Sequence, residues 1–129
     1  MEEKVLKIYE QKYFSKKTNK EEVAKNIYFK TRVDKKTGAI YEGLQLDQFA
    51  IVEKLFVEGF KNQQPTYTFY NVKAKYQDQE VSFAISEKEH EQFKECGGIG
   101  DKIKVFITQN KYTAKGKEYT SLVVNFELV

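Results

Sequence analysis

Two stretches of the chain alternate lysine and aromatic side chains with apolar ones, a pattern that suits contact with nucleic acid. Successive side chains of a β-strand point to opposite faces of its sheet. In residues 67–76 and 102–108 one face is therefore largely apolar, while the other carries cations and rings. Lysines neutralise phosphates, and a base stacked on a ring contributes ~1–3 kcal/mol. The candidates on the outward face are Tyr67, Phe69, Lys73, Lys75, Lys102, Lys104 and Phe106.

Further residues of the same types extend this candidate site. Residues 111–117 are expected to form an exposed, lysine-rich hairpin loop, which leads into a strand over residues 119–128. An earlier strand of the same sheet adds one cation and one ring. These additional candidates are Lys54, Phe56, Lys111, Tyr112, Lys115, Lys117 and Tyr119.

The same side chains have structural explanations that compete with ligand binding. Outward rings such as Phe69 and Phe106 can pack beneath the N-terminal segment or at a homodimer interface. Outward lysines can form a solvated strand face that discourages unwanted edge pairing. The choice depends on which face of the sheet meets solvent.

Little else in the sequence suggests chemistry. His90 is the only histidine, and a typical metal site needs three or four suitably spaced ligands. Cys96 is interpreted as a small apolar group. The run Gly97–Gly100 lacks the Lys-Ser/Thr of a phosphate-binding loop and follows a helix, so it is interpreted as a turn. We therefore expect no enzymatic activity, no metal and no cofactor.

Composition predicts a folded chain in a reducing compartment. The 129 residues are 40% hydrophobic and 15% aromatic, with one proline and seven glycines. No run approaches the ~20 apolar residues that span a bilayer, so no membrane association is expected. The single cysteine cannot form an internal disulfide, which favours the cytoplasm.

Charge is distributed unevenly and suggests two regions. Residues 1–46 hold 11 Lys/Arg and 7 Asp/Glu, a net charge of +4, whereas residues 47–129 hold 11 and 12, a net charge of −1. We expect an N-terminal extension over 1–46 and one domain over 47–129. The basic segment Lys12–Lys36 fits either a phosphate-contacting arm or a solvated face.

The N-terminal extension is expected to contain helices and a hairpin. Apolar residues recur every three or four positions over residues 2–14, which predicts a helix. Thr18 and Glu21 form a capping-box pattern that predicts a second helix to about residue 26. Residues 27–33 and 39–44 flank a turn that ends at Gly38, which predicts a hairpin.

The second region is expected to contain five strands and one helix. The strands are predicted over residues 49–60, 66–76, 79–85, 102–109 and 119–128, with a bend at Gly59 in the first of them. Ser86 and Glu89 form a capping box for a helix over residues 87–96. In the alternative architecture, residues 49–60 are a helix, and two helices pack on a separate sheet.

The order strand–strand–strand–helix–strand–strand carries a family resemblance. It includes the strand Val81–Ile85, the helix Glu87–Glu95, the stretch Gly100–Val105 and the loop Lys115–Lys117. On these features, residues 48–129 resemble the oligonucleotide-binding-fold single-stranded DNA-binding proteins of bacteriophages and mobile elements. The resemblance implies a mainly β, five-stranded Greek-key barrel with a helix between strands 3 and 4. It also implies that strands 2–3 and two loops hold nucleic acid.

The sequence thus favours non-catalytic, sequence-tolerant binding of single-stranded DNA in replication or recombination. RNA is an alternative ligand, because no residue is evidently placed to read a 2′-hydroxyl. Replication or recombination proteins are the expected protein partners. The competing hypothesis is a protein-interaction module of a phage or mobile element. Such a module would be an accessory subunit of a replication enzyme or an inhibitor of a host nuclease, with the aromatic face as its contact surface.

Overall fold

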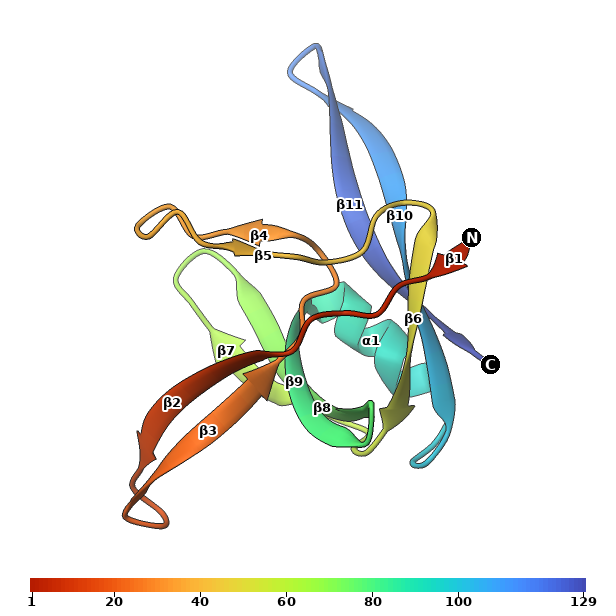
Figure 1. The fold of residues 1–129 in the computed structure, drawn as a ribbon. Helices are drawn as coiled ribbons and strands as arrows, with labels where there is room; N and C mark the ends of the chain where they lie inside the picture. Colours follow the sequence, from red (N-terminus) through yellow and green to blue (C-terminus); the bar gives the residue numbers. More distant parts are fainter.

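The structure, a computed structural model, describes residues 1–129 as a mainly β chain with one helix (Figure 1). The helix, α1 (Glu87–Glu95), lies between β9 and β10. The strands are β1 (Glu2–Glu3), β2 (Tyr9–Ser15), β3 (Lys20–Asn26), β4 (Arg32–Val33), β5 (Ile40–Tyr41), β6 (Gln48–Lys54), β7 (Phe60–Gln63), β8 (Thr68–Tyr76), β9 (Gln79–Ser86), β10 (Lys102–Ala114) and β11 (Lys117–Leu128).

Most strands form one open, mixed sheet. Its order is β11-β10-β6-β8-β9-β3-β2, with β1 added to β6 in parallel and β7 added to β8. α1 packs against β8, β9 and β11 on the inner side of the curved sheet. The mainly β class and the helix between the third and fourth predicted strands are confirmed. The predicted closed barrel is wrong, because β9 and β11 do not pair.

The N-terminal chain fills the opening between β9 and β11. The Phe29 ring lies 4.6 Å from the ring of Phe83 on β9 and 6.4 Å from that of Phe126 on β11. The Leu44 N–H donates to the Phe29 carbonyl over 2.7 Å. The Phe29 side chain thus occupies the opening where pairing of β9 with β11 would close a barrel.

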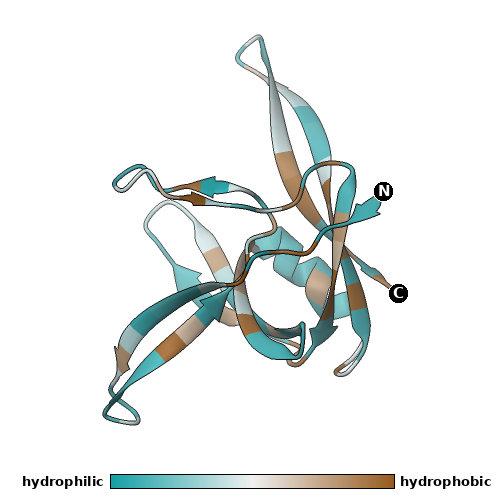
Figure 2. Cartoon of the chain, in the orientation of Figure 1, coloured by the Kyte–Doolittle hydropathy of each residue, from teal (hydrophilic) through white to brown (hydrophobic).

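The strand alternation predicted for β8, β9 and β10 is confirmed. Burying a Val, Leu, Ile or Phe side chain contributes about 1.5–3 kcal/mol, so these inner faces hold the sheet together. Figure 2 shows the division along β10 and β11, with hydrophobic residues near the body and hydrophilic ones toward the hairpin tip. The buried residues of β8–β10 are Val72, Ala74, Tyr76, Val81, Phe83, Ile85, Ile103, Val105 and Ile107.

Residues 1–46 share this core with the rest of the chain. They contribute four buried side chains to the same hydrophobic cluster as the inner faces of β8, β9 and β10. The N–H of one of them, Leu6, donates to the Tyr76 hydroxyl over 2.8 Å. The four residues are Leu6, Ile27, Phe29 and Leu44.

The two helices predicted for the N-terminal region are wrong, because this region forms the β2–β3 hairpin. Leu6 is buried in the segment between β1 and β2, whereas Phe14 is exposed on the hairpin. The apolar residues that gave the helical spacing therefore lie in two separate environments. The Thr18 hydroxyl donates to Glu22 instead of capping a helix. Asn19, with φ 55°, supplies the left-handed turn position.

Other local predictions are confirmed. β4 and β5 form the expected hairpin, with the Gly38 N–H donating to the Asp34 carbonyl. Ser86 and Glu89 form the capping box of α1. The bend at Gly59 is also present, but the single strand predicted over residues 49–60 is divided into β6 and β7, which both pair with β8. A Cβ at Gly59 would lie 2.7 Å from the Asn71 carbonyl oxygen, so the close approach of the bend requires glycine.

α1 is the only helix, and it is too short and too polar to cross a membrane.

Candidate nucleic-acid interface

A groove of about 600 Å³ opens between the base of the β4–β5 hairpin and the β7–β8 hairpin. These two hairpins extend from the same side of the body in Figure 1. The end of β9 and the start of α1 form the floor of the groove. Its lining residues are Ile27–Val33, Tyr67–Phe69, Ala84–Ser86, Glu89 and Val124.

One wall of the groove is a pair of stacked rings. The ring centroids of Tyr67 and Phe69 lie 5.9 Å apart, with 28° between the ring planes. The β7–β8 hairpin positions them, because the Gln64 N–H donates to the Tyr67 carbonyl and closes the turn at Pro65-Thr66. Tyr67 is 60% exposed, so one ring of the stack is available to a flat ligand.

The opposite wall carries two cations, Lys30 and Arg32. Lys30 Nζ lies 3.5 Å from Glu89 Oε2, so its charge is largely compensated. Arg32, the only arginine of the chain, lies on β4 opposite Tyr41 of β5 and is exposed. Arginine binds phosphate in a planar, two-pronged arrangement. Arg32 is therefore the phosphate-binding candidate of this wall.

Glu89 of α1 connects the groove floor to β9 and β11. Its Oε1 accepts from the Ser86 N–H over 2.8 Å, and the Glu89 N–H donates to Ser86 Oγ over 3.3 Å. Its Oε2 accepts from the Val124 N–H of β11 over 2.7 Å. Because Glu89 is buried and fully engaged, its role here is to fix the floor.

Three tyrosines hold the β4–β5 hairpin against the β2–β3 hairpin. Tyr28 and Tyr41 stack with centroids 4.8 Å apart, and Tyr9 meets both edge-on. The Glu42 N–H donates to the Tyr9 hydroxyl over 2.8 Å. Burial, aided by Tyr41, raises the pKa of Tyr28. This cluster fixes the base of the hairpin that carries Arg32.

The structure divides the predicted site residues among several surfaces. Tyr67 and Phe69 line the groove. Lys75, Lys102, Lys104 and Phe106 instead lie on the outer face of β8, β6 and β10, and Lys73 lines a separate hollow beside β3 and β9.

Acidic neighbours compensate the cations of that outer face. Glu53 of β6 stands between Lys75 of β8 and Lys102 of β10 in the strand register. Lys104 stands opposite Glu127 of β11. In the strand register, carboxylates thus offset part of the positive charge that would attract phosphates.

Phe106 packs on the sheet rather than into the groove. It pairs with Phe49 of β6 and is half-buried. The Lys104 ammonium lies 4.9 Å from the Phe49 ring centroid and 5.9 Å from that of Phe106. These cation–π contacts account for both rings without a ligand.

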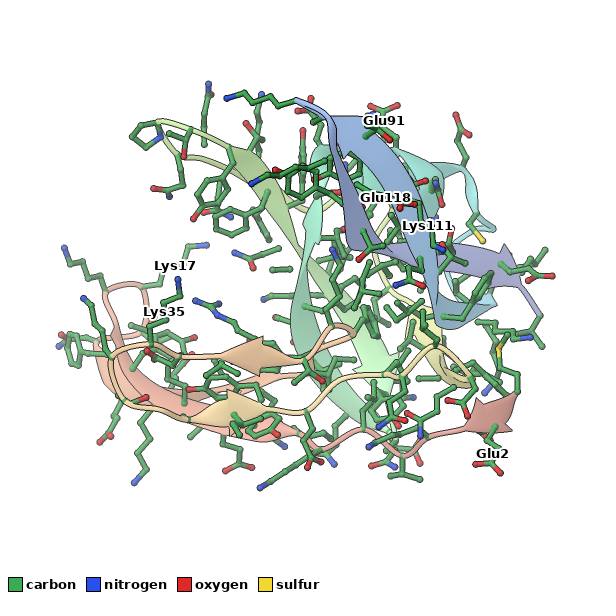
Figure 3. All side chains as sticks on the ribbon, turned by 90° about the horizontal axis from the view of Figure 1, so that it is seen from above. Glu2, Lys17, Lys35, Glu91, Lys111 and Glu118 are labelled. Atoms are coloured by element: carbon green, nitrogen blue, oxygen red, sulfur yellow. The ribbon has the colours of Figure 1, made fainter.

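Five predicted residues lie on the long β10–β11 hairpin. The loop predicted over residues 111–117 is wrong, because strand pairing continues to Ala114 opposite Lys117. Tyr112 and Tyr119 form a cross-strand pair with ring centroids 5.6 Å apart. The lysines of this hairpin, Lys111, Lys115 and Lys117, are exposed. Figure 3 places Lys111 and Glu118 on this hairpin, away from Lys17 and Lys35 on the β2–β3 and β4–β5 turns. The hairpin is a second basic aromatic surface, separate from the groove.

Two predicted site residues are corrected. Lys54 is 0% exposed and points into the body, where its ammonium bonds carbonyls at the end of α1. It shares its strand parity with buried Ala50 and Val52, so it cannot reach a surface ligand. Phe56 is exposed but belongs to the β6–β7 bend and does not line the groove.

Sequence reasoning did not single out the wall opposite the rings. Residues 28–32 of this wall belong to the basic segment Lys12–Lys36, whose charge was the only signal. No local pattern indicates that Arg32 and Tyr67, distant in sequence, line one groove.

The remaining chemistry-bearing residues have structural roles. His90 Nε2 accepts from the Gly59 N–H over 2.9 Å, and its ring stacks on Tyr70 at 3.8 Å. Burial raises the pKa of the half-buried Cys96 thiol. Gly97 and Gly100 have positive φ values and form the predicted turn. No three His, Cys, Asp or Glu side chains gather into a group that fits a metal ion.

No protein-family model, curated protein or solved structure matches the chain.

Proposed function

We propose that this protein binds single-stranded nucleic acid in the groove between the β4–β5 and β7–β8 hairpins. The observation that carries the proposal is an exposed two-ring stack, Tyr67 on Phe69, across the groove from the exposed cation Arg32. Rings and cations are the two components of sequence-tolerant single-strand binding.

In this proposal a base stacks on the free face of Tyr67 and extends the existing stack. Arg32 then holds a neighbouring phosphate, and Lys35 at the tip of the same hairpin adds long-range attraction. Stacking accepts every base because each has a π-face. DNA is the proposed ligand, and the binding is non-catalytic, in replication or recombination.

The arrangement of β6–β11 supports an open relative of the oligonucleotide-binding fold. β8 and β9 correspond to its second and third strands, the β7–β8 turn to its first loop, and the β10–β11 hairpin to its last. In this chain the inserted segment that includes Phe29 replaces the closing strand pair and supplies a groove wall of its own.

The test is a fluorescence polarisation titration with labelled oligo-dT. Replacing Tyr67 and Phe69 together by Ala should weaken binding at least about tenfold, because two stacking surfaces are lost. The matched control replaces Tyr112 and Tyr119, a second exposed stacked pair outside the groove, and should change affinity by less than about threefold. Unchanged affinity in a groove variant with native circular dichroism refutes the site.

A protein partner is the second candidate, favoured by one specific observation. Val33 and Ile40 are a cross-strand pair on the β4–β5 hairpin and are 57% and 61% exposed. Exposed apolar pairs of this kind suit a protein contact. Retention on a single-stranded DNA column that falls strongly with salt supports nucleic acid. Flow-through at low salt supports the protein partner.

A further inference from the structure

The floor of the groove includes a stretch of strand edge that the protein leaves unpaired. β9 pairs with β8 along its whole length, but its other edge meets β3 at one position only, Asn26 opposite Ser82. Beyond that point the N-terminal chain leaves β9 and becomes the far wall of the groove. The part of this edge from Ala84 to Ser86 therefore faces the groove.

The direction of the edge groups follows from the bonds on either side. The Ser82 carbonyl accepts from the Ile27 N–H over 3.0 Å, so the Ser82 backbone points away from β8. The Ser86 N–H, four residues on, donates to Glu89 on the same side. Because backbone polar groups of a strand alternate in direction, the Ala84 N–H and C=O also point away from β8.

Between Ser82 and Ser86, Ala84 is thus the residue whose outward donor and acceptor both remain free. Continued parallel pairing would join the Ala84 N–H to the Ile27 carbonyl and the Phe29 N–H to the Ala84 carbonyl. Neither bond forms; the Phe29 carbonyl accepts from Leu44 instead. Ala84 is exposed and lines the groove, between the aromatic wall and the cationic wall.

We infer that the Ala84 backbone reads the Watson–Crick edge of the base that stacks in the groove. In an extended residue the N–H and C=O lie side by side and point the same way. Every unmodified base presents an adjacent donor and acceptor on its Watson–Crick edge, which proteins contact in unpaired strands. For thymine, N3–H donates to the Ala84 carbonyl, and a ring carbonyl accepts from the Ala84 N–H.

This inference rests on the proposed function and adds a selection rule to it. A base in a duplex has its Watson–Crick edge occupied, so the Ala84 contact admits only unpaired bases. The walls favour a base over a peptide strand at this edge, because one wall is a ring stack and the other carries Arg32, which suits phosphate.

The first test changes the ligand and leaves the protein intact. Titrations compare oligo-dT with an oligomer of N3-methylthymidine, which keeps the ring, sugar and phosphate but loses the N3–H donor. The wild-type protein should bind the methylated oligomer about fivefold more weakly. Oligo-dU, which lacks only the 5-methyl group, is the control and should bind like oligo-dT. Equal affinity for oligo-dT and the methylated oligomer overturns the inference and leaves the edge to another occupant, such as a peptide strand.

The second test removes the protein donor. Ala84→Pro deletes an N–H that bonds no strand, a change that strand edges tolerate, and Ala84→Ser is its control. The proline variant should bind oligo-dT more weakly while its already weak binding of the methylated oligomer stays unchanged. Equal weakening toward both oligomers indicates a structural effect and overturns the inference. If circular dichroism shows that the proline variant is misfolded, the ligand comparison alone decides. If the wild type does not bind oligo-dT at all, the proposed function itself is contradicted. If it binds oligo-dT and the methylated oligomer equally, only the Ala84 inference fails.

Discussion

Lys54 Nζ lies 2.6 Å from the carbonyl oxygen of Phe93, at the C-terminal end of α1. The same ammonium also approaches the carbonyl oxygens of Lys94, Cys96 and Gly97 within 3.2 Å. It thus satisfies carbonyls that a helix end leaves without intrahelical partners, and it places a cation at the negative end of the helix dipole. Burial lowers the pKa of this lysine.

Lys54→Met should destabilise the protein by about 2–4 kcal/mol, because several helix-end carbonyls lose a charged donor in a buried site. Methionine keeps most of the side-chain volume, so the loss reports the hydrogen bonds. Urea denaturation measures the change. Lys61→Met, at an exposed position on β7, is the matched control and should change stability by less than about 0.5 kcal/mol. Equal stabilities of the Lys54 variant and the wild type would contradict a stabilising role for these hydrogen bonds.

The free energy of unfolding should fall between pH 7 and pH 5 because of His90. Burial, followed by the nearby Lys94, lowers the pKa of His90 below its usual 6.5, against weaker opposing effects of Glu58 and Glu91. The unfolded chain then binds a proton more readily than the folded protein as the pH falls. Stability is therefore full above about pH 6.5 and decreases as the pH falls toward the folded-state pKa.

His90→Gln is the control for this pH dependence. Its amide oxygen can accept from the Gly59 N–H, as His90 Nε2 does, but it does not titrate. Urea denaturation at several pH values should show a slope for the wild type and a flatter line for this variant. Parallel slopes would assign the pH dependence to other groups.

Gly43→Ala should destabilise the protein by about 2 kcal/mol or more. A Cβ at Gly43 would lie 2.6 Å from the Phe29 carbonyl oxygen and 2.6 Å from the Lys30 carbonyl carbon. Both atoms belong to the backbone of the groove wall, which must move to make room. Gly98→Ala is the control, because a Cβ there has only Asp101 Oδ2 nearby, at 3.8 Å. Similar thermal midpoints for the two variants would contradict the close approach at Gly43.

Arg32→Ala should weaken oligo-dT binding and reduce its salt dependence. Each neutralised phosphate of a single strand contributes about 0.7 to the slope of log affinity against log salt. The variant's slope should therefore be smaller by about that amount. Lys102→Ala removes a cation that stands beside Glu53, outside the groove, and should leave the slope unchanged. The assignment fails if the Lys102 variant lowers the slope and the Arg32 variant does not.

The inner faces of the central strands could be predicted because they depend on local alternation. Val72 and Ala74 on β8, and Ile103 and Val105 on β10, are buried as the period of two requires. The capping box at Ser86 is equally local, and it formed as expected. These features need only a few neighbouring residues.

The N-terminal prediction failed where distant contacts decide the structure. The Leu6 N–H donates to the Tyr76 hydroxyl, 70 residues away, and this bond helps to hold Leu6 between β1 and β2. Tertiary contacts of this kind override a helical spacing. Lys54 was placed on the outward face together with Phe56, although its parity with Ala50 and Val52 indicated the inside.

Only the aromatic wall of the candidate groove could be predicted from the sequence. Tyr67 and Phe69 were identified from the strand pattern, whereas the charge of Arg32 was visible without its position. Phe106 has the same alternating pattern as Phe69 but packs beside Phe49 and Lys104. The same alternation of side chains on two strands therefore does not show that their outward rings lie in one site.

Titration of labelled oligo-dT with the wild-type protein, at low and at physiological salt, tests the central claim most directly. The account predicts saturable binding that weakens as salt increases and that is at least about tenfold weaker in the Tyr67→Ala/Phe69→Ala variant. Absence of binding at low salt, by a protein whose circular dichroism shows the folded state, would contradict it.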